Sequence, residues 1–325
     1  MTRPEVVITD CDLPGQAGED VLRSAGLSVT RASCVTEEDV VEAARGATAL
    51  VVQWAPVSSA VLDQLGSLRF VSRLGIGYDM IDVEAAAARG IAVANTPTYC
   101  VEEVASHTVA MLLALTRGLV GYDRAVRAGE WAPTQARPMA VRPSTTTVAV
   151  IGYGRIGALT AQHCRALGFR VLVHDPYVDA DVIRHAGCQP VDLDEALSSA
   201  DALTLHAPLT PRTRHLVNAR TLAAVKPGAV IVNTCRGPLV DDAALVDALR
   251  SGRLSGAALD VYESEPLAPD HPLCGLDNVI LTPHAAWYSP EALADLPVHA
   301  ARNVVDFLAG RPVDSIVNGN RAPAG

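Results

Sequence analysis

The sequence predicts an α/β protein with two domains, each built on a doubly wound parallel sheet. Short apolar runs alternate with helical patterns along most of the chain, which is typical of parallel strands joined by right-handed crossover helices. The 325 residues are enough for two domains with cores of their own. A composition that is 49% hydrophobic but only 4% aromatic fits sheets rich in Ala, Val and Leu.

The first domain is expected to take residues 1–99 together with residues 288–325. Strand-like runs precede Thr96-Pro97, in the order VVITD, LSVTRA, ALVVQW, FVSRLG and IAVANT, with helical patterns between them near 19–24, 37–44 and 82–90. A last helical pattern over 290–308 has no strand partner near it in sequence, so we expect it to return to this domain. The first domain is therefore predicted to be discontinuous.

The second domain is expected to span residues 100–287. It opens with a helical pattern from Val101 to about Ala128, whose apolar stripe predicts one long helix that serves as a domain connector or a subunit contact. A polar loop over 133–147 follows. The strand-like runs after it are VAVI, VLVHD, DALTLHAP, AVIVNT, GAALDV and NVILTPH, which is what a full doubly wound sheet needs.

A glycine motif lies at the start of this second sheet. Gly152, Gly154 and Gly157 form G-x-G-x-x-G between the run at 148–151 and a helical pattern that ends near Leu167. The first glycine permits a tight turn, the second lets the backbone approach a pyrophosphate, and the third lets the helix pack closely on its strand. The uncapped amides of the helix then face the phosphates. The motif predicts a Rossmann-like, dinucleotide-binding domain.

An acidic residue supports this interpretation and indicates which dinucleotide binds. Asp175 ends the run VLVHD, where a carboxylate can accept from both ribose hydroxyls. The same carboxylate repels a 2′-phosphate, and the DPYVDA stretch contains no arginine. NAD is therefore favoured over NADP.

Further polar residues follow the strands of the same sheet, at the edge where ligands bind in doubly wound folds. They are His206, Arg236, Asp260, Glu265 and His284. Arginine offers a bidentate fork to a carboxylate, and histidine can pass one proton per turnover while a neighbouring glutamate favours its charged form. Singly, each has an ordinary structural explanation, and Asp260 in particular could form a turn. Jointly, they predict a site for hydride transfer.

Charge and cysteine usage narrow the other possibilities. The net charge of −10 argues against nucleic acid or an anionic membrane as a partner, while leaving room for a basic pocket that binds a small anion. The seven cysteines are scattered and form no C-x-x-C pair, which fits reduced thiols. No leader and no membrane-spanning run is recognised, and no metal site is predicted. We expect a cytoplasmic protein.

Several motifs resemble the D-isomer-specific 2-hydroxyacid dehydrogenases. In the second domain they are GYGRIG…HDPY, NTCRGPLVD, GAALDVYESEPL and LTPHAAW, and in the first SRLGIGYDMIDVEAA and NTPTYCVEEVASHTVAMLLAL. The stretches HAAWYS and YCVEEVA resemble most the branch that contains the C-terminal binding proteins and phosphoglycerate dehydrogenase-like enzymes. The resemblance implies a homodimer with a discontinuous substrate domain and an active site between the domains.

The resemblance also implies roles for individual residues. Arg236 would bind the substrate carboxylate and carbonyl, His284 would protonate the carbonyl oxygen, and Glu265 would keep His284 protonated and oriented. Substrate contacts would come from Arg73, from the amides of Gly75, Ile76 and Gly77, and from Trp287. Cofactor contacts would come from the glycine motif with Arg155 and Ile156, and from Asp175, His206, Pro208, Thr234, Cys235, Asp260, Ala286 and Thr108.

The chain departs from the family pattern in places. Pro297 lies inside the last helical pattern, where a proline removes a backbone hydrogen bond and kinks a helix. Residues 139–146 match weakly. Trp287 stands where many relatives have a small residue, and either narrows the substrate pocket or packs at the hinge.

The leading hypothesis is an NAD-dependent dehydrogenase that interconverts a 2-oxo acid and a D-2-hydroxy acid. One alternative is an NAD-sensing dimeric binding protein of the corepressor kind, in which turnover is incidental. The other is a dehydrogenase that acts on phosphite or a hydroxyphosphonate, because the same pocket can hold a tetrahedral oxyanion. Formate oxidation is disfavoured by the glutamate at position 265.

Overall fold

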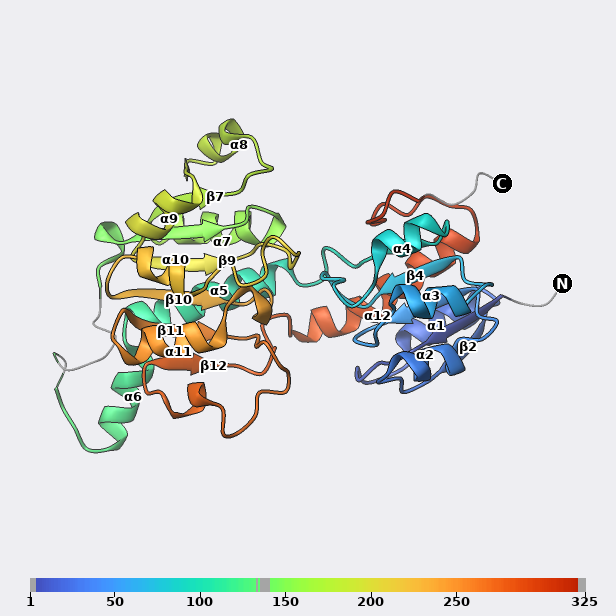
Figure 1. Ribbon diagram of the computed structural model, residues 1–325, viewed down its shortest axis with the longest axis horizontal. Helices are drawn as coiled ribbons and strands as arrows, with labels where there is room; N and C mark the ends of the chain where they lie inside the picture. Colours follow the sequence, from blue (N-terminus) through green and yellow to red (C-terminus); the bar gives the residue numbers. More distant parts are fainter. Residues whose placement is uncertain (1–3, 133, 135–140, 321–325) are drawn as a thin grey trace. The chain divides into compact units, whose positions relative to one another are not determined.

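The computed structural model describes residues 4–132, 134 and 141–320. The chain divides into two compact units, the first made of Met1–Cys100 with Tyr288–Gly325 and the second of Val101–Trp287 (Figure 1). These limits lie one residue from the expected boundary near 100. Part of the polar loop expected at 133–147 lies outside the described residues.

Unit 1 is built on a parallel sheet. Among the described residues its strands take the order β2-β1-β3-β4-β5, which is the doubly wound order of flavodoxin-like folds. The strands are β1 (Glu5–Ile8), β2 (Ser28–Arg31), β3 (Ala49–Val52), β4 (Phe70–Arg73) and β5 (Ala92–Ala94). The helices are α1 (Ala17–Ser24), α2 (Glu37–Ala43), α3 (Ser59–Gln64), α4 (Val83–Ala88) and α12 (Pro290–Leu308).

Alternating strand residues give unit 1 a core on each face of the sheet. Val7, Leu50 and Val71 face α2, α3 and α4. On the opposite face Phe70 stacks on Phe307 of α12 with ring centroids 4.4 Å apart. The C-terminal helix thus completes the first domain, as its lack of a neighbouring strand partner predicted. Helix α3, capped by the Ser58 side chain, was not predicted.

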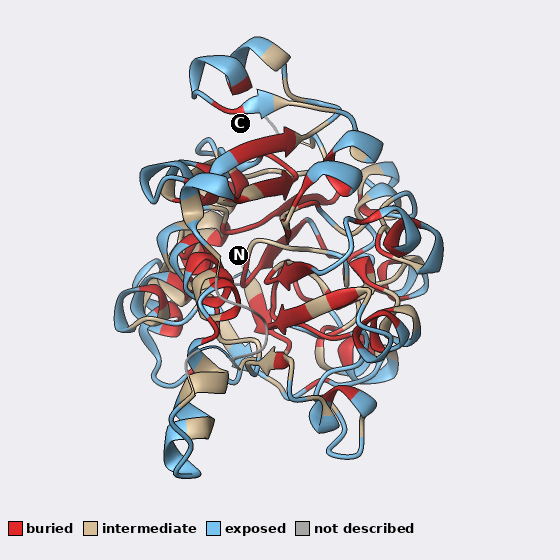
Figure 2. Cartoon of the chain, turned by 90° about the vertical axis from the view of Figure 1, so that its left-hand side faces the viewer, coloured by how far each residue is buried: buried red, intermediate tan, exposed pale blue. Residues whose placement is uncertain are grey.

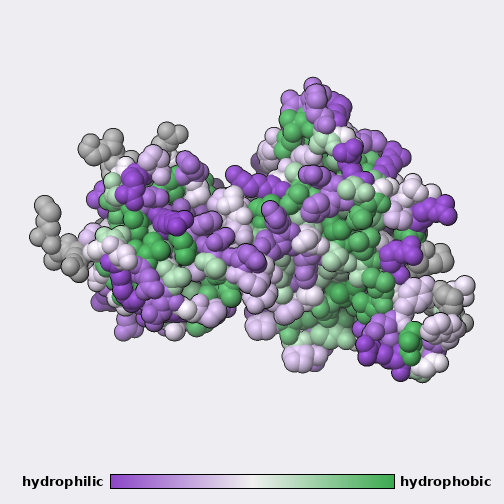
Figure 3. All heavy atoms as spheres, turned by 180° about the vertical axis from the view of Figure 1, so that it is seen from behind, coloured by the Kyte–Doolittle hydropathy of each residue, from purple (hydrophilic) through white to green (hydrophobic). Residues whose placement is uncertain are grey.

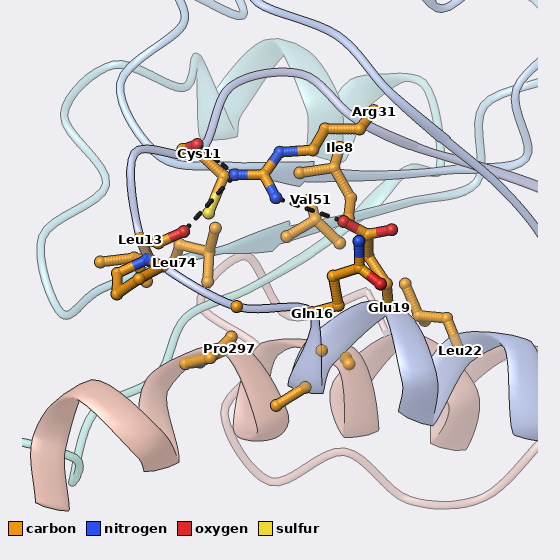
Figure 4. Close-up of a pocket in the computed structure, with 15 residues that line it drawn as sticks. Ile8, Cys11, Leu13, Gln16, Glu19, Leu22, Arg31, Val51, Leu74 and Pro297 are labelled. Carbon is orange, nitrogen blue, oxygen red and sulfur yellow. Dashed lines mark hydrogen bonds and ion pairs between the residues drawn. The ribbon is translucent and has the colours of Figure 1, made fainter.

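Helix α12 continues through Pro297 from Pro290 to Leu308. It packs along α1, where a Cβ on Gly18 would lie 2.8 Å from the Pro297 carbonyl oxygen. Figure 4 shows Pro297 facing α1 across the small pocket at this crossing. The pocket has a volume of about 30 Å³, room for roughly one water molecule, so it is not a substrate cavity.

Unit 2 carries the second parallel sheet. Within the described part of the chain the strand order is β12-β11-β10-β9-β6-β7-β8, the Rossmann order with one strand added at an edge. The strands are β6 (Thr147–Ile151), β7 (Arg170–His174), β8 (Gln189–Pro190), β9 (Ala202–Leu205), β10 (Ala229–Asn233), β11 (Leu254–Leu259) and β12 (Val279–Leu281). Only the short edge strand β8 was not expected.

Helices cover both faces of this sheet. They are α5 (Val101–Thr116), α6 (Leu119–Arg127), α7 (Arg155–Ala166), α8 (Ala180–His185), α9 (Leu193–Ser199), α10 (Ala219–Ala224) and α11 (Asp242–Arg250). Buried residues of α5 and α7 share one core with Val148 and Val150, while α9, α10 and α11 share the other with Ala149 and Ile151. Figure 2 shows the buried strands inside a shell of helices with exposed outer surfaces.

The prediction of a single long helix from Val101 to about Ala128 is wrong. The structure has two helices, α5 and α6, that are bent by 58° at the break. Gly118 has a φ of 65°, in the left-handed region that ends a helix, so the chain turns there. No single described helix is long and apolar enough to cross a membrane; α5 and α6 meet that test only as a bent pair, and α5 is largely a core helix of unit 2.

Candidate active site

The glycine loop after β6 needs its first and third glycines because of close backbone contacts. Gly152 has a φ of 98°, and a Cβ on it would lie 2.6 Å from the His206 backbone. A Cβ on Gly157 would lie 2.1 Å from the Gly152 carbonyl oxygen. Gly154 is different, because a Cβ there would meet nothing within 4 Å. The loop is closely packed at Gly152 and Gly157 and open at Gly154, where a phosphate needs room.

Helix α7 begins at this open position. Its N-cap is Gly154, which provides no side-chain cap, so the amides of the first turn, including those of Arg155 and Ile156, are available to an anion. Asp175 closes the loop from the end of β7, where its carboxylate accepts from the Tyr153 amide at 2.7 Å and the Tyr177 amide at 2.9 Å. These residues fit the diphosphate and one ribose of a dinucleotide.

His206 and Pro208 follow β9 beside the loop. The His206 amide donates to the Ile151 carbonyl at 2.7 Å, and the ring Nε2 is buried. Burial lowers the pKa of His206 to about 4, so the imidazole is neutral at physiological pH. In this structure His206 supports the glycine loop from below. Pro208 is exposed, and a contact of either residue with adenosine remains a prediction.

The residues expected around the nicotinamide come together at the end of β10. Thr108 of α5 and Thr234 share a buried hydrogen bond of 2.7 Å between their hydroxyl oxygens. The Cys235 thiol donates to the Ala207 carbonyl at 3.0 Å. These small polar side chains bind α5 to the strand ends, and their contacts with a nicotinamide ring remain predictions.

Asp260 has a structural task that sequence reasoning named only as an alternative. Its carboxylate is fully buried at the end of β11. It accepts from the Thr282 hydroxyl and from the amides of Ala285 at 2.8 Å and Ala286 at 2.9 Å. The His284 amide donates to the Asp260 carbonyl at 2.8 Å. Asp260 therefore organises the turn that carries His284, and its expected contact with the nicotinamide amide remains a prediction.

The turn brings His284 to Glu265. His284 has a φ of 53°, which a non-glycine residue adopts only when its surroundings hold it there. Its Nδ1 lies 2.7 Å from Glu265 Oε2, while Glu265 Oε1 accepts from the Tyr262 amide at 3.0 Å. The glutamate thus fixes the plane of the ring. Nδ1 is thereby assigned to the carboxylate, so any proton transfer to a substrate would use Nε2.

The ionisation of Glu265 suits this role. Burial by itself would raise the pKa of Glu265, but the hydrogen bond and charge of His284, the Tyr262 amide and the charge of Arg236 together lower the pKa below its ordinary value. Glu265 is therefore ionised at neutral pH and accepts from His284 as a carboxylate.

Arg236 lies on the loop after β10, close enough to Glu265 for its charge to act on that carboxyl. Its carbonyl accepts from the Asn233 side chain at 2.8 Å, and its Nη1 donates to the Cys235 carbonyl at 2.8 Å. The next residue, Gly237, packs against the loop that carries Glu265. A Cβ on Gly237 would lie 1.8 Å from the Tyr262 carbonyl oxygen in that loop. The structure thus brings Arg236, Glu265 and His284 together within unit 2.

The substrate residues expected from the first domain lie together in unit 1. Arg73 is buried at the end of β4. Its guanidinium lies against Gly75, where an added Cβ would be 2.7 Å from Arg73 Nη1. Gly75 has a φ of 145°. Its amide donates to the Thr96 hydroxyl at 2.8 Å. The contacts expected between a substrate and the amides of Gly75, Ile76 and Gly77 remain predictions. Trp287, half-buried, is the last residue of unit 2.

The sequence patterns do not single out Trp54 and Gly237, although the structure places both beside candidate site residues. The strand-like run ALVVQW includes Trp54, whereas β3 ends at Val52 and Trp54 lies beyond it, at a strand end where ligands can bind. Gly237 lies in the NTCRGP motif, but nothing in the sequence shows the close contact that requires a glycine. Within the described ranges no group of His, Cys, Asp and Glu side chains could hold a metal ion.

Comparisons with known proteins agree with this geometry. The model for the D-isomer specific 2-hydroxyacid dehydrogenase, NAD binding domain, matches residues 109–286. The chain is 34% identical over 323 residues to hydroxypyruvate reductase of Blautia hydrogenotrophica, covering 96% of this chain and 99% of that protein. It is 37% identical over 300 residues to D-3-phosphoglycerate dehydrogenase of Archaeoglobus fulgidus, covering 92% of this chain but 56% of that longer protein.

A solved structure extends the similarity to both units. D-lactate dehydrogenase from Aquifex aeolicus, complexed with NAD and lactic acid, has a TM-score of 0.85 and 29% identity, covering 97% of this chain and 99% of that one. The fold and the glycine loop define a dinucleotide-binding protein. More specifically, the chain belongs to the D-isomer specific 2-hydroxyacid dehydrogenase family.

The contact at Gly237 makes a testable prediction. Gly237→Ala should lower the free energy of unfolding by about 1–3 kcal/mol, because the added methyl overlaps the Tyr262 backbone and forces the two loops apart. Gly275→Ala is the matched control, since a Cβ on Gly275 would meet nothing within 4 Å. Urea unfolding followed by circular dichroism measures both. Equal stability of Gly237→Ala and the control would contradict the close contact.

Proposed function

We propose that this protein is an NAD-dependent dehydrogenase that interconverts a 2-oxo acid and its D-2-hydroxy acid. The observation that carries the proposal is the His284–Glu265 pair, 2.7 Å apart and within reach of the Arg236 charge, on strand ends of a sheet that has a dinucleotide loop. The names of relatives, hydroxypyruvate reductase and D-lactate dehydrogenase, support small 2-oxo and 2-hydroxy acids as the substrate class.

The residues divide the work of the reaction. Reduction of a carbonyl needs one hydride and one proton, and the nicotinamide cofactor supplies the hydride when bound. Arg236 holds the substrate carboxylate and polarises the carbonyl with its charge. His284 donates the proton from Nε2 to the carbonyl oxygen, and Glu265 stabilises the imidazolium and orients it. In the oxidation direction the same nitrogen takes the proton from the hydroxyl.

The role of the pair can be tested by pH dependence. A carboxyl with a lowered pKa stays ionised above that value, so wild-type Glu265 supports the imidazolium throughout the neutral range and is lost as a partner only as the pH falls through its folded-state pKa. In Glu265→Gln the imidazolium loses this charge. Steady-state NADH oxidation with glyoxylate should therefore fall by about 10-fold or more at pH 7, with the alkaline limb of kcat/KM moved to lower pH.

A second glutamate provides the control. Glu263 pairs with His215 at 2.6 Å and has a similar side-chain exposure, 30% against 32% for Glu265. Glu263→Gln should leave the pH profile in place. His284→Ala should cost about 10²-fold to 10⁴-fold in turnover. A His284→Ala enzyme with wild-type turnover would overturn the assignment, and NAD reduction by phosphite, or tight NADH binding with no turnover, would favour the alternatives.

We propose NAD as the physiological cofactor, because the Asp175 carboxylate ends β7 where a ribose would lie. Asp175→Asn keeps an oxygen for the Tyr153 amide but removes the charge that repels a 2′-phosphate. The ratio of kcat/KM for NADH over NADPH should fall by about 10-fold, the effect of one charge at short range near a surface. Asp179→Asn, which changes an exposed carboxylate at the start of α8, should leave the ratio unchanged. An unchanged ratio in Asp175→Asn would refute the role.

We also propose a homodimer, supported by the surface of unit 2. Helix α6 has no buried residue and projects from the unit in Figure 1, and Leu119 and Val126 on it are 56% and 55% exposed. Trp131, just beyond it, is also exposed. In Figure 3 hydrophobic residues cover much of the face of this unit that is in view. Such surface is typical of a subunit contact.

Charged residues on this helix should separate the subunits. Leu119→Glu combined with Val126→Glu should halve the mass measured by light scattering, because two carboxylates would be buried in the contact. Val182→Glu on α8 changes a side chain of the same 56% exposure and should leave the mass unchanged. A dimeric double variant would exclude α6 as the contact, and a monomeric wild type would exclude the dimer.

A further inference from the structure

The strand order of unit 1 marks a ligand position of its own. In the order β2-β1-β3-β4-β5, β2 is added to one side of β1, whereas β3, β4 and β5 are added to the other side. The switch point of the sheet therefore lies between β1 and β3. Ligands of doubly wound sheets bind beyond the carboxyl ends of the strands at this point. The residues directly beyond these two strands include Asp10 after β1 and Trp54 after β3. Arg73 ends β4, the next strand, and pairs with Val52 in the sheet register.

Asp10 fixes the loop that carries Trp54. Its carboxylate accepts from the amides of Gln53 at 3.0 Å, Trp54 at 2.5 Å and Ala55 at 3.1 Å. The Gln53 side chain is held in turn by Asp12, whose amide donates to it at 3.0 Å. Hydrogen bonds from its backbone amides to Asp10 thus hold the loop in place, and they fix the position of the Trp54 backbone.

The Trp54 ring covers the buried guanidinium of Arg73. The Arg73 Cζ lies 5.1 Å from the ring centroid, a cation–π distance. The guanidinium also lies against Gly75, whose missing Cβ makes room for it. Trp54 nevertheless remains 47% exposed, so a large aromatic surface is presented beside the residues expected to hold the substrate carboxylate.

The small pocket at the crossing of α1 and α12 does not compete for this role. It lies at the α1–α12 crossing, where Arg31 is already bonded to the Cys11 carbonyl and to Glu19, as Figure 4 shows. Its volume of about 30 Å³ does not admit an organic acid.

We propose that Trp54 selects the side chain of the substrate, favouring 2-oxo acids with an apolar aliphatic or aromatic group over phosphorylated or charged ones. The inference rests on the proposed dehydrogenase function and specifies its substrate. An acid whose carboxylate is held by the 73–77 segment places its next carbons beside the ring. The ring offers dispersion contacts over a wide flat face, which suit an apolar group. It also covers one face of the nearest guanidinium, which would otherwise attract a second anionic group.

Substrate preference tests the proposal. NADH oxidation is measured with glyoxylate, which has no side chain, and with 4-methyl-2-oxopentanoate, phenylpyruvate and 3-phosphohydroxypyruvate. For the wild type, kcat/KM should be highest for one of the two apolar acids and at least about 10-fold lower for the phosphorylated acid. Trp54→Ala should lower kcat/KM for the apolar acids by about 10-fold to 100-fold while changing that for glyoxylate by less than about 3-fold.

Two further variants separate recognition from support of the fold. Trp54→Phe keeps an aromatic face and should retain most of the preference. Val35→Ala removes an exposed hydrophobic side chain of the same unit, 79% exposed, and should change no ratio. An equal loss on all four acids in Trp54→Ala, or a wild type that prefers the phosphorylated acid, overturns the role of Trp54 while leaving the dehydrogenase function intact. No turnover on any acid, glyoxylate included, overturns both.

Discussion

The chemistry of this protein depends on one buried carboxylate that never needs to touch a substrate. Asp260 is fully enclosed at the end of β11, where a carboxylate without partners would cost several kcal/mol. The Thr282 hydroxyl and the amides of Ala285 and Ala286 satisfy it, and in doing so they wrap the chain around it. His284 lies inside this wrap with a left-handed backbone, and its ring is thereby directed at Glu265. His284 is therefore held in place because the buried Asp260 carboxylate requires hydrogen-bond donors.

Close backbone contacts supply the second constraint. Gly152 and Gly157 let the strand, the turn and helix α7 approach within distances that no side chain permits, which leaves the helix N-terminus open above them. Gly237 does the same between the loop of Arg236 and the loop of Glu265. Because backbone meets backbone at each point, neither loop can shift without the other. Arg236 and the His284–Glu265 pair are therefore held in fixed positions relative to one another.

Unit 1 uses a similar device for a different purpose. The Asp10 carboxylate gathers three successive amides beyond β3, and this places an exposed tryptophan over a buried arginine. A fixed aromatic surface beside an anion anchor is suited to discriminate between substrates by the side chain that each acid carries. The His284–Glu265 pair and Trp54 thus lie in separate units of the chain, and each is positioned by a carboxylate, that of the buried Asp260 in unit 2 and that of the half-buried Asp10 in unit 1.

Local patterns in the sequence were sufficient for the two parallel sheets, the discontinuous first domain and the glycine loop, because strand and helix periodicities and glycine spacings act over a few residues. The choice of Arg236, Glu265 and His284 as candidates came from their places after strands and from the resemblance to a family. Tertiary contacts decided the rest. These features join residues that are distant in sequence, or they depend on the space around a residue. They are the break at Gly118, the room that Gly18 leaves for Pro297, the support of the glycine loop by His206, the turn around Asp260 and the stacking of Trp54 on Arg73. Such contacts follow from packing and from the pairing of buried polar groups, which a linear pattern does not contain.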